Sequence, residues 1–408
     1  MPKIKEISCH KIINSRGDWT IETKVVLDDG ATGVQAIPDG ASKGQNEAIY
    51  IPVEKAVDIV STVINEALKG EGAENQSALD KVLISMDGTP NKRNLGGNSI
   101  LSVSLAIASA MAKSLQLELY EYLSVLYKGE KIKKNELKFP TPVFNILNGG
   151  KHAENNLSFQ EFMVIPAREI SFDRALEIGV NIYHLLEKNL SRKGIGTEVG
   201  DEGGFAPRGF TTEKALASIR ESALERYEVG KDVFLGIDVA AGSFFNMDRY
   251  EIKEEGKKLS REELLSYYED LINKYELIYV EDSFYEGDTL GWKSFYEKFK
   301  DKLMIVADDL VVTNSKFLQT AVEEGLANAV IVKPNQVGTL TETLDFIKMA
   351  KENKMSVVVS HRSGDNAEDT FIADLALAVS AEFIKSGAPV RGERVSKYNR
   401  LLDVFLGE

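Results

Sequence analysis

Five short apolar segments in the second half of the chain each end on an ionisable side chain, and this pattern constrains the fold more than any other feature. The segments FLGI, IYV, IVA, VIV and VVVS lead into Asp238, Glu281, Asp308, Lys333 and His361. The last four of these residues are 27, 25 and 28 positions apart, about the length of one strand and one helix. A single such charge is ordinarily a solvated group where a strand reaches water. Five in succession indicate parallel strands whose carboxyl ends share one edge.

Helix-like segments separate these strands. The stretch SREELLSYYEDLI opens with Ser260 and Glu263 at the spacing of a capping box, and its apolar residues then fall on one helical face. Strands joined by single helices pair in parallel through right-handed crossovers. From about Phe139 onward the chain has room for a complete (β/α)8 barrel, which takes about 250 residues. We therefore predict an α/β protein with a TIM-like barrel.

The first third of the chain has a different pattern. TIETKVVLDDGATGVQAI alternates apolar and polar residues around a DDG turn, which predicts a β-hairpin, and residues 53–68 and 98–126 are helix-like. The lysine-rich segment 128–140 has little apolar content and ends in Pro140, which is typical of a linker. We predict an N-terminal α+β capping domain with a lid loop over residues 1–135, and a barrel carrying the active site over residues 136–408.

Composition excludes several classes of function. The chain of 408 residues has a formal net charge of −14, which argues against a nucleic-acid or anionic-membrane surface. Its single cysteine, Cys9, cannot form an internal disulfide, and the first residues contain no secretory apolar region. We expect a cytoplasmic protein that binds neither nucleic acid nor membrane and acts on a small molecule.

The side chains at the strand ends predict acid–base chemistry assisted by a metal ion. Three carboxylates on neighbouring strand ends repel one another unless a cation lies between them, and ligands that are all oxygen favour Mg²⁺ or Mn²⁺ over zinc. A lysine opposite that cation would have its ammonium form disfavoured, so Lys333 could act as a base near neutral pH. Arg362, Ser363 and Lys385 add donors suited to phosphate or carboxylate. The pattern predicts removal of a proton next to a carboxylate.

Longer motifs surround these residues: SHRSG, GDEGGFAP, NGGKHAENNLSFQEFMVIP, VADDLVVTN, KPNQVGTLTET and IKSGAP…RGERVSKYN. Together they resemble the enolase family, and the similarity runs from SRG near Ser15 to KYNRLL near the C-terminus. The resemblance implies an N-terminal α+β domain, a barrel of the enolase type, and assembly as a homodimer or larger homo-oligomer. It also implies Mg²⁺-dependent, reversible dehydration of 2-phospho-D-glycerate to phosphoenolpyruvate.

The resemblance further implies metal ligands. Carried over motif by motif, Asp238, Glu281 and Asp308 hold a Mg²⁺ ion that binds the substrate carboxylate. Ser42, in the lid, corresponds to the family's ligand for a second Mg²⁺, so two ions are expected in each active site.

Catalytic and substrate-binding roles follow in the same way. Lys333 takes the C2 proton, and Glu202 of GDEGG donates a proton to the departing C3 hydroxyl. Without their motifs, Glu202 would read equally well as a turn carboxylate and His152 as a loop histidine. The predicted catalytic set is completed by Glu161, His152 and His361, and the predicted substrate-binding set is Gln160 on the leaving-group side, Arg362 and Ser363 at the phosphate, and Lys385 at the carboxylate.

The lid departs from the family pattern. It reads PDGASKGQNEA, with Asp39 and Lys43 new and Asn46 in the place of a histidine. We hypothesise that Asp39 repels the substrate phosphate unless Lys43 or metal offsets it. Two alternatives therefore stay open: a divergent dehydratase acting on a related phosphorylated or acid-sugar substrate, and a binding protein without catalytic activity on the same scaffold.

Overall fold

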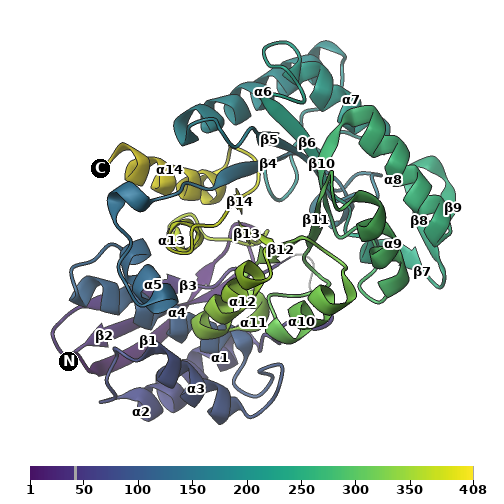
Figure 1. The fold of residues 1–408 in the computed structure, drawn as a ribbon. Coiled ribbons are helices and arrows are strands. Elements are labelled where there is room, and N and C mark those ends of the chain that lie inside the picture. The colour runs from purple at the N-terminus through teal and green to yellow at the C-terminus, as the bar shows by residue number, and fades with distance from the viewer. Residues whose placement is uncertain (41–43, 408) are drawn as a thin grey trace.

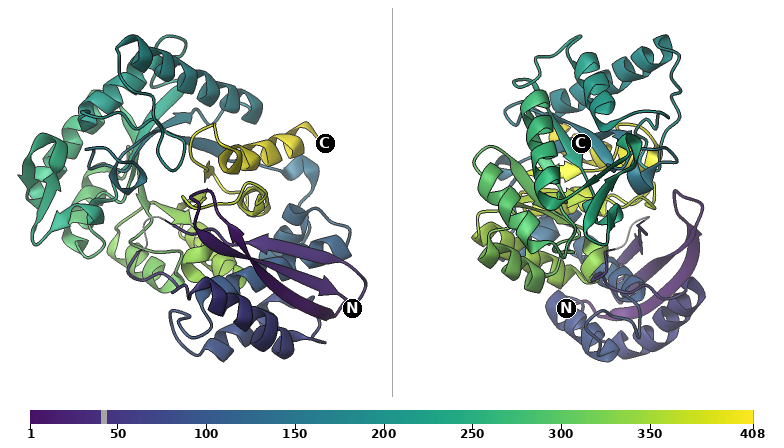
Figure 2. Two further views of the ribbon diagram at one scale, coloured as in Figure 1. Left: turned by 180° about the vertical axis from the view of Figure 1, so that it is seen from behind. Right: turned by 90° about the vertical axis from the view of Figure 1, so that its right-hand side faces the viewer.

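The computed structural model describes residues 1–40 and 44–407. The chain forms an N-terminal sheet covered by helices, and an eight-stranded closed barrel surrounded by helices (Figure 1). The predicted α/β class with an N-terminal α+β domain is confirmed. Figure 2 shows the N-terminal part, in purple and blue, packed to one side of the barrel in two further views.

The N-terminal part begins with three antiparallel strands in the order β1-β2-β3, including the predicted hairpin of β2 and β3. Helical segments follow, of which η1 is a π-helical stretch within the continuous helix from α1 to α2. The elements are β1 (Ile4–Ile13), β2 (Trp19–Leu27), β3 (Thr32–Ala36), α1 (Val53–Ile59), η1 (Val60–Ile64), α2 (Asn65–Leu68), α3 (Gln76–Asp87), α4 (Gly97–Ser114) and α5 (Leu119–Lys128).

The helix predicted over residues 98–126 is in fact two helices. Helices α4 and α5 meet at an angle of 109°. Gln116 adopts φ +54° between them, and Glu118 then opens α5 with a capping box formed with Glu121. Apolar periodicity continues across this junction, so the sequence pattern alone did not reveal the bend. Most of α4 is buried, because the sheet covers one side of it and other helices pack around it.

The barrel closes in the strand order β10-β11-β12-β13-β14-β4-β5-β6. Its strands are β4 (Thr141–Asn148), β5 (Glu161–Pro166), β6 (Val233–Asp238), β10 (Leu277–Glu281), β11 (Met304–Ala307), β12 (Ala329–Val332), β13 (Ser356–Ser360) and β14 (Phe383–Lys385). Alternate side chains point inward along each strand and fill the interior. This inner core consists of Val143, Met163, Ile165, Tyr279, Val306, Ala329, Ile331, Val358 and Phe383.

Helices surround the barrel: α6 (Phe172–Arg192), α7 (Thr212–Ala223), α8 (Arg261–Tyr275), α9 (Thr289–Phe299), α10 (Ser315–Glu324), α11 (Pro334–Val337), α12 (Leu340–Glu352), α13 (Phe371–Ala378) and α14 (Gly392–Leu406). The predicted capping box is present at α8, where the Ser260 amide donates to Glu263 Oε2 at 2.7 Å. A small sheet of β7 (Phe245–Asn246), β8 (Arg249–Ile252) and β9 (Lys257–Leu259) lies between β6 and α8 in the chain. Short 3₁₀ turns are η2 (Lys134–Glu136), η3 (Gly150–His152), η4 (Ala241–Ser243) and η5 (Lys253–Glu255).

One barrel strand runs against the others. Strand β5 pairs antiparallel with both β4 and β6, whereas the remaining neighbours are parallel. Its first residue, Glu161, therefore lies opposite Asn148 and Asp238, the last residues of β4 and β6. The reversal brings the start of β5 to the rim where the other strands end.

The N-terminal part is attached to this rim by polar contacts. The amide of Leu340 donates to Ser104 Oγ at 3.0 Å, and Thr341 Oγ1 donates to Asp80 at 2.6 Å. Near the site, Asp39 and Gly364 exchange two backbone hydrogen bonds of 2.8 Å. These bonds join the beginning of the lid to the loop that follows β13.

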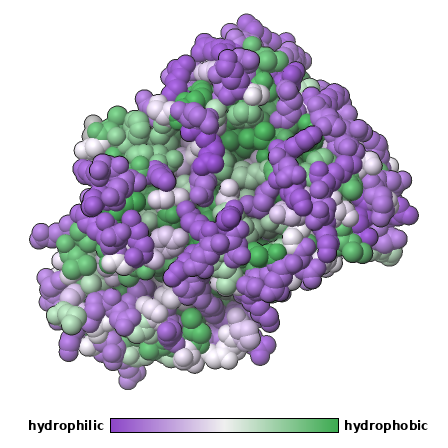
Figure 3. Space-filling view, viewed as in Figure 1, coloured by the Kyte–Doolittle hydropathy of each residue, from purple (hydrophilic) through white to green (hydrophobic). Residues whose placement is uncertain are grey.

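Hydrophilic residues cover most of the face shown in Figure 3, with hydrophobic residues scattered among them. Among the residues that the structure describes, no single helix is long and apolar enough to cross a membrane. Only α4 and α5 taken together, with their bend, meet that length and composition.

Candidate active site

The predicted strand-end residues meet at one rim of the barrel. Asp238, Glu281 and Lys385 are the last residues of β6, β10 and β14. Asp308, Lys333 and His361 each follow directly after a strand, namely β11, β12 and β13. The predicted location of these side chains, together at one edge of the barrel, is therefore confirmed.

A small cavity opens at this rim. Apart from Glu281 and Asp308, it is lined by every predicted site residue that the structure describes. Its lining is Gly40, His152, Gln160, Glu161, Glu202, Asp238, Lys333, Ser360, His361, Arg362, Ser363 and Lys385. Ser42 and Lys43 lie outside the described residues.

One wall of the cavity is a buried group of carboxylates around Lys385. Its Nζ lies 2.8 Å from Glu161 Oε2, 2.9 Å from both oxygens of Glu281 and 3.3 Å from Asp238 Oδ2. Burial alone would lower the pKa of Lys385, but these three carboxylates raise it well above its usual value. Burial and the charge of Asp238 raise the pKa of Glu281 to about 7. One ammonium group therefore does not fully offset the repulsion among these acids.

Lys333 and Asp308 form the neighbouring pair. The Lys333 ammonium donates to Asp308 Oδ2, and Gln336 Nε2 donates to Asp308 Oδ1 at 2.8 Å. Burial would lower the pKa of Lys333, but Asp308 outweighs it and raises this pKa. The expected disfavouring of the ammonium form is thus not found in this arrangement. A neutral Lys333 was expected only with a cation bound at the carboxylates. Such a cation would compete with the Lys333 ammonium for Asp308 and so weaken the contact that raises this pKa.

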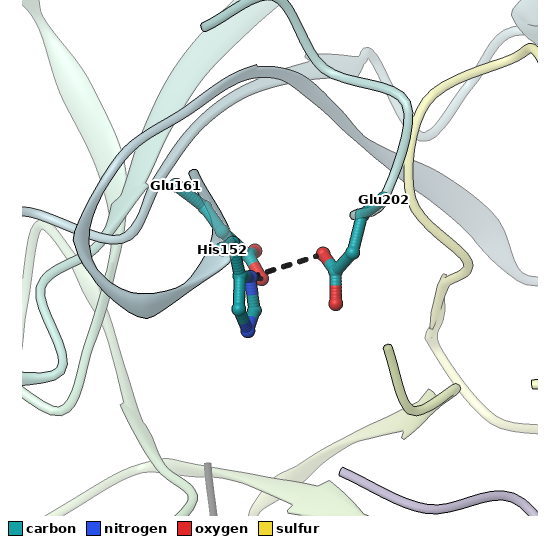
Figure 4. Close-up of side chains that lie close together, drawn as sticks. All are labelled: His152, Glu161 and Glu202. Atoms are coloured by element: carbon teal, nitrogen blue, oxygen red, sulfur yellow. Dashed lines mark ion pairs between the residues drawn. The ribbon is translucent and has the colours of Figure 1, made fainter. Parts of the chain in front are cut away.

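Glu202 and His152 lie close together beside Glu161 (Figure 4). His152 Nδ1 lies 3.3 Å from Glu161 Oε1 and 3.4 Å from Glu202 Oε2. Burial opposes protonation of His152, but the two carboxylates outweigh it and raise its pKa to about 10. The pKa of Glu202 is well below its usual range because His152 and His361 outweigh the effect of burial. At neutral pH the shared proton therefore resides on His152, and Glu202 is ionised.

Two further contacts complete the surroundings of Glu202. Asn145 Nδ2 donates to Glu202 Oε2 at 2.9 Å, and His361 Nε2 lies 3.5 Å from Glu202 Oε1. Glu202 belongs to the loop between α6 and α7, and His152 belongs to η3 between β4 and β5. Loops from separate parts of the barrel therefore converge on one carboxylate.

The lid side of the cavity is built around Arg362. Arg362 Nη1 lies 3.0 Å from Glu47 Oε2, and both side chains are buried. The backbone of Gly40 lies directly over the guanidinium: a Cβ at that position would come within 2.0 Å of Arg362 Nη2. Asn46, the other described departure in the lid, is exposed.

Several contacts at the site were not predicted. The sequence analysis missed Glu47, Asn145 and Asp282. The Asp282 carboxylate accepts hydrogen bonds from the backbone amides of Asp308 and Asp309, at 2.9 Å each. A polar residue within the apolar run PVFNILN was the available signal for Asn145. Glu47 gave no signal, because its partner Arg362 is 315 positions away.

The acidic groups fit a divalent cation in composition. Two groups of three residues each bring their ligand atoms within 4.8 Å of one another: Asp282, Asp308 and Asp309 form one group, and His152, Glu161 and Glu202 form the other. The predicted ligands are distributed differently, because Asp238 and Glu281 share Lys385 while Asp308 bonds Lys333. Among the described residues, four buried carboxylates, Glu161, Asp238, Glu281 and Asp308, face two lysines. The excess of negative charge among oxygen ligands suits a hard divalent ion.

A barrel with buried carboxylates, lysines and a carboxylate–histidine pair at its carboxyl-end rim defines an acid–base enzyme of the TIM-barrel class. Comparison with protein families gives a more specific result. Residues 4–123 match the family model described as enolase, N-terminal domain, and residues 136–405 match enolase, C-terminal TIM barrel domain. The chain belongs to this family and is thus a member of the enolase superfamily, whose domains indicate a lyase-type dehydratase.

Proposed function

We propose that the protein catalyses the reversible dehydration of 2-phospho-D-glycerate to phosphoenolpyruvate. One observation carries the proposal: a single cavity is lined by Lys333, by the Glu202–His152 pair, and by Arg362 and Lys385 as cationic groups. Dehydration next to a carboxylate needs these elements, namely a base for one carbon, an acid for the leaving group, and cations for the anionic ends.

We propose the following proton transfers. Lys333 accepts the proton from C2 in its neutral form, which would become accessible once a cation bound at the carboxylates competes for Asp308 and removes the contact that raises the pKa of Lys333. The C3 hydroxyl then leaves as water with a proton from the Glu202–His152 pair, and the electron pair left at C2 forms the C2=C3 bond. The high pKa of His152 keeps one proton in this pair at neutral pH, and its 3.4 Å distance to Glu202 gives that proton a short path to the carboxylate.

We propose Mg²⁺ as the metal, with Asp238, Glu281 and Asp308 as ligands. When bound, it would supply positive charge that stabilises the substrate carboxylate as negative charge accumulates on it. The carboxylates themselves are fixed by neighbours: Tyr279 OH donates to Glu281 at 2.5 Å and Gln160 Nε2 donates to Asp238 at 3.3 Å. A second Mg²⁺ held by Ser42 remains part of the proposal.

The alternative substrate classes are less well matched. The cavity is small, includes Gly40 beside Arg362 in its lining, and is lined almost wholly by polar and charged groups. Arg362 and Lys385 offer cations for two anionic groups, and a three-carbon phosphorylated acid carries one such group at each end. A role limited to binding would leave the buried pair of Glu202 and His152 without a purpose. We further propose that the protein is cytoplasmic and forms a homo-oligomer. Sedimentation of the purified chain would test the oligomeric state.

The test is a coupled absorbance assay of phosphoenolpyruvate formation from 2-phosphoglycerate with added Mg²⁺. Lys333→Ala serves as the inactive control, and 3-phosphoglycerate and six-carbon sugar acids serve as competing substrates. We expect turnover of 2-phosphoglycerate that depends on Lys333. Turnover of a sugar acid with none of 2-phosphoglycerate would establish the divergent-dehydratase alternative instead.

A further inference from the structure

Arg394 lies in the first turn of α14, the C-terminal helix, and its side chain is fully buried behind the active site. Its guanidinium does not line the cavity. Instead it contacts the two loops that carry Glu202 and His361. A buried arginine at such a junction is costly to desolvate unless its donors are used, so its contacts are informative.

The contact with His361 determines where that imidazole carries its proton. Arg394 Nη1 lies 2.6 Å from His361 Nδ1. A guanidinium has only N–H donors, so Nδ1 must be the acceptor and the imidazole must be unprotonated there. In the neutral ring the proton then resides on Nε2. This nitrogen lies 3.5 Å from Glu202 Oε1, so it presents an N–H to the carboxylate.

The same guanidinium holds the backbone of both loops. Nη1 also donates to the Arg362 carbonyl at 2.7 Å, and Nη2 donates to the carbonyls of Ser363 and Asp201, the latter at 3.2 Å. Asp201 directly precedes Glu202 in the chain. The four Nη donors therefore have four acceptors, which the three donors of a lysine ammonium could not match in number or geometry.

We propose that Arg394 is a positioning residue that holds neutral His361 with its proton on Nε2 against Glu202, and that this N–H orients Glu202 for proton donation. The consequence for catalysis rests on the proposed dehydration; the location of the proton does not.

The local electrostatics agree with a neutral ring. The pKa of His361 is lowered to about 4, because burial and the charge of Arg394 together outweigh the opposing effects of Glu202 and Asp365. Groups that face the ring are Glu202, Arg394 and, more distantly, Asp365. Removing the guanidinium charge would therefore raise the pKa of His361 and allow Nδ1 to take up a proton.

The first experiment reads the proton directly. Two-bond ¹H–¹⁵N spectra of the imidazole rings are recorded for the full-length protein at neutral pH, and His361 is assigned by its loss in His361→Gln. We expect an unprotonated Nδ1 and a protonated Nε2 in the wild type. Protonated Nδ1, or an imidazolium, would overturn the proposal, whatever reaction the enzyme catalyses.

The second experiment separates positioning from general structural support. Arg394→Met removes the donors, Arg394→Lys keeps the charge, and Arg400→Met is a matched control on the same helix that bonds Asp374 and Glu118 instead. Both Arg394 variants should lose dehydration by about 10- to 100-fold, a part of what a positioned proton donor contributes. Both should retain exchange of the C2 proton with solvent, because Lys333 carries out that step.

The outcomes distinguish a positioning role of Arg394 from a merely structural one. Equal loss of exchange and dehydration in the Arg394 variants would identify a merely structural residue, and unchanged dehydration in Arg394→Lys would exclude the positioning role. If Arg394→Met does not fold, as judged by circular dichroism, Arg394→Lys and the wild-type spectrum still decide. If the wild type forms no phosphoenolpyruvate, the proposed function fails, while the spectrum still tests the location of the proton.

Discussion

The close approach of Gly40 to Arg362 yields a quantitative prediction for Gly40→Ala. A Cβ at this position would lie 2.0 Å from Arg362 Nη2 and 2.5 Å from Cζ and Nε. An ordinary van der Waals contact begins near 3.4 Å, so either the guanidinium or the lid must move by at least about 1.4 Å, the difference between the two distances. Arg362 is buried and bonded to Glu47, so it cannot move this far and keep its present geometry.

The magnitude follows from the hydrogen bonds at risk. A hydrogen bond to a charged group contributes about 1.5–3 kcal/mol. Losing one to the substrate phosphate should lower kcat/KM for 2-phosphoglycerate by about 10- to 150-fold, since every 1.4 kcal/mol is a factor of ten. The loss should be mainly in KM, because Lys333 and Glu202 keep their places.

Steady-state kinetics and thermal unfolding of the purified variant test this prediction. Gly392→Ala is the matched control, since its added Cβ would meet only Ala367 Cβ, at 3.7 Å. Gly40→Ala with wild-type KM and unchanged thermal stability would refute the reasoning, because it would mean that Arg362 does not lie under the lid in the working enzyme.

Three further predictions concern the metal, the pH dependence and the lid. Activity should vanish with excess chelator and return with Mg²⁺, and full activity in chelator would refute the metal site. Glu281→Ala should weaken Mg²⁺ binding, as measured by calorimetry. The pKa of His152 is raised from 6.5 to about 10, so its stabilising contribution is complete below about pH 6.5 and is lost as the pH rises through 10. Denaturant unfolding should accordingly show the wild type losing stability relative to His152→Gln between pH 7 and 10, and parallel profiles would contradict this. Asp39→Ser should lower KM for 2-phosphoglycerate with a smaller effect on kcat, since its bonds to Gly364 are backbone bonds that serine keeps; abolished turnover would instead make Asp39 a catalytic or metal-binding group.

The sequence predicted those parts of the molecule that local pattern determines. Asp238, Glu281, Asp308, Lys333 and His361 end successive strands as expected, because the strand–helix period and the parallel topology together place them on one rim. The roles assigned to these and the other site residues remain predictions.

Features that depend on packing between distant segments were not predicted. The reversal of β5 depends on pairing with both neighbours, and it is what brings Glu161 beside Asp238. The bend after Ser114 lies within a continuous apolar pattern. Arg394 lies 33 positions from His361, and nothing in its own motif indicates a buried contact with that ring. Such contacts are fixed by tertiary structure, which residue type and spacing do not encode locally.

The central claim is that Lys333 begins the reaction and Glu202 completes it, and the most direct measurement compares the two steps in one experiment. 2-Phosphoglycerate is incubated in deuterated water with Lys333→Ala or Glu202→Gln, and NMR follows both deuterium at C2 and phosphoenolpyruvate. We predict that Lys333→Ala gives neither signal, whereas Glu202→Gln incorporates deuterium without forming product. Exchange at the wild-type rate in Lys333→Ala, or full product formation by Glu202→Gln, would contradict the account.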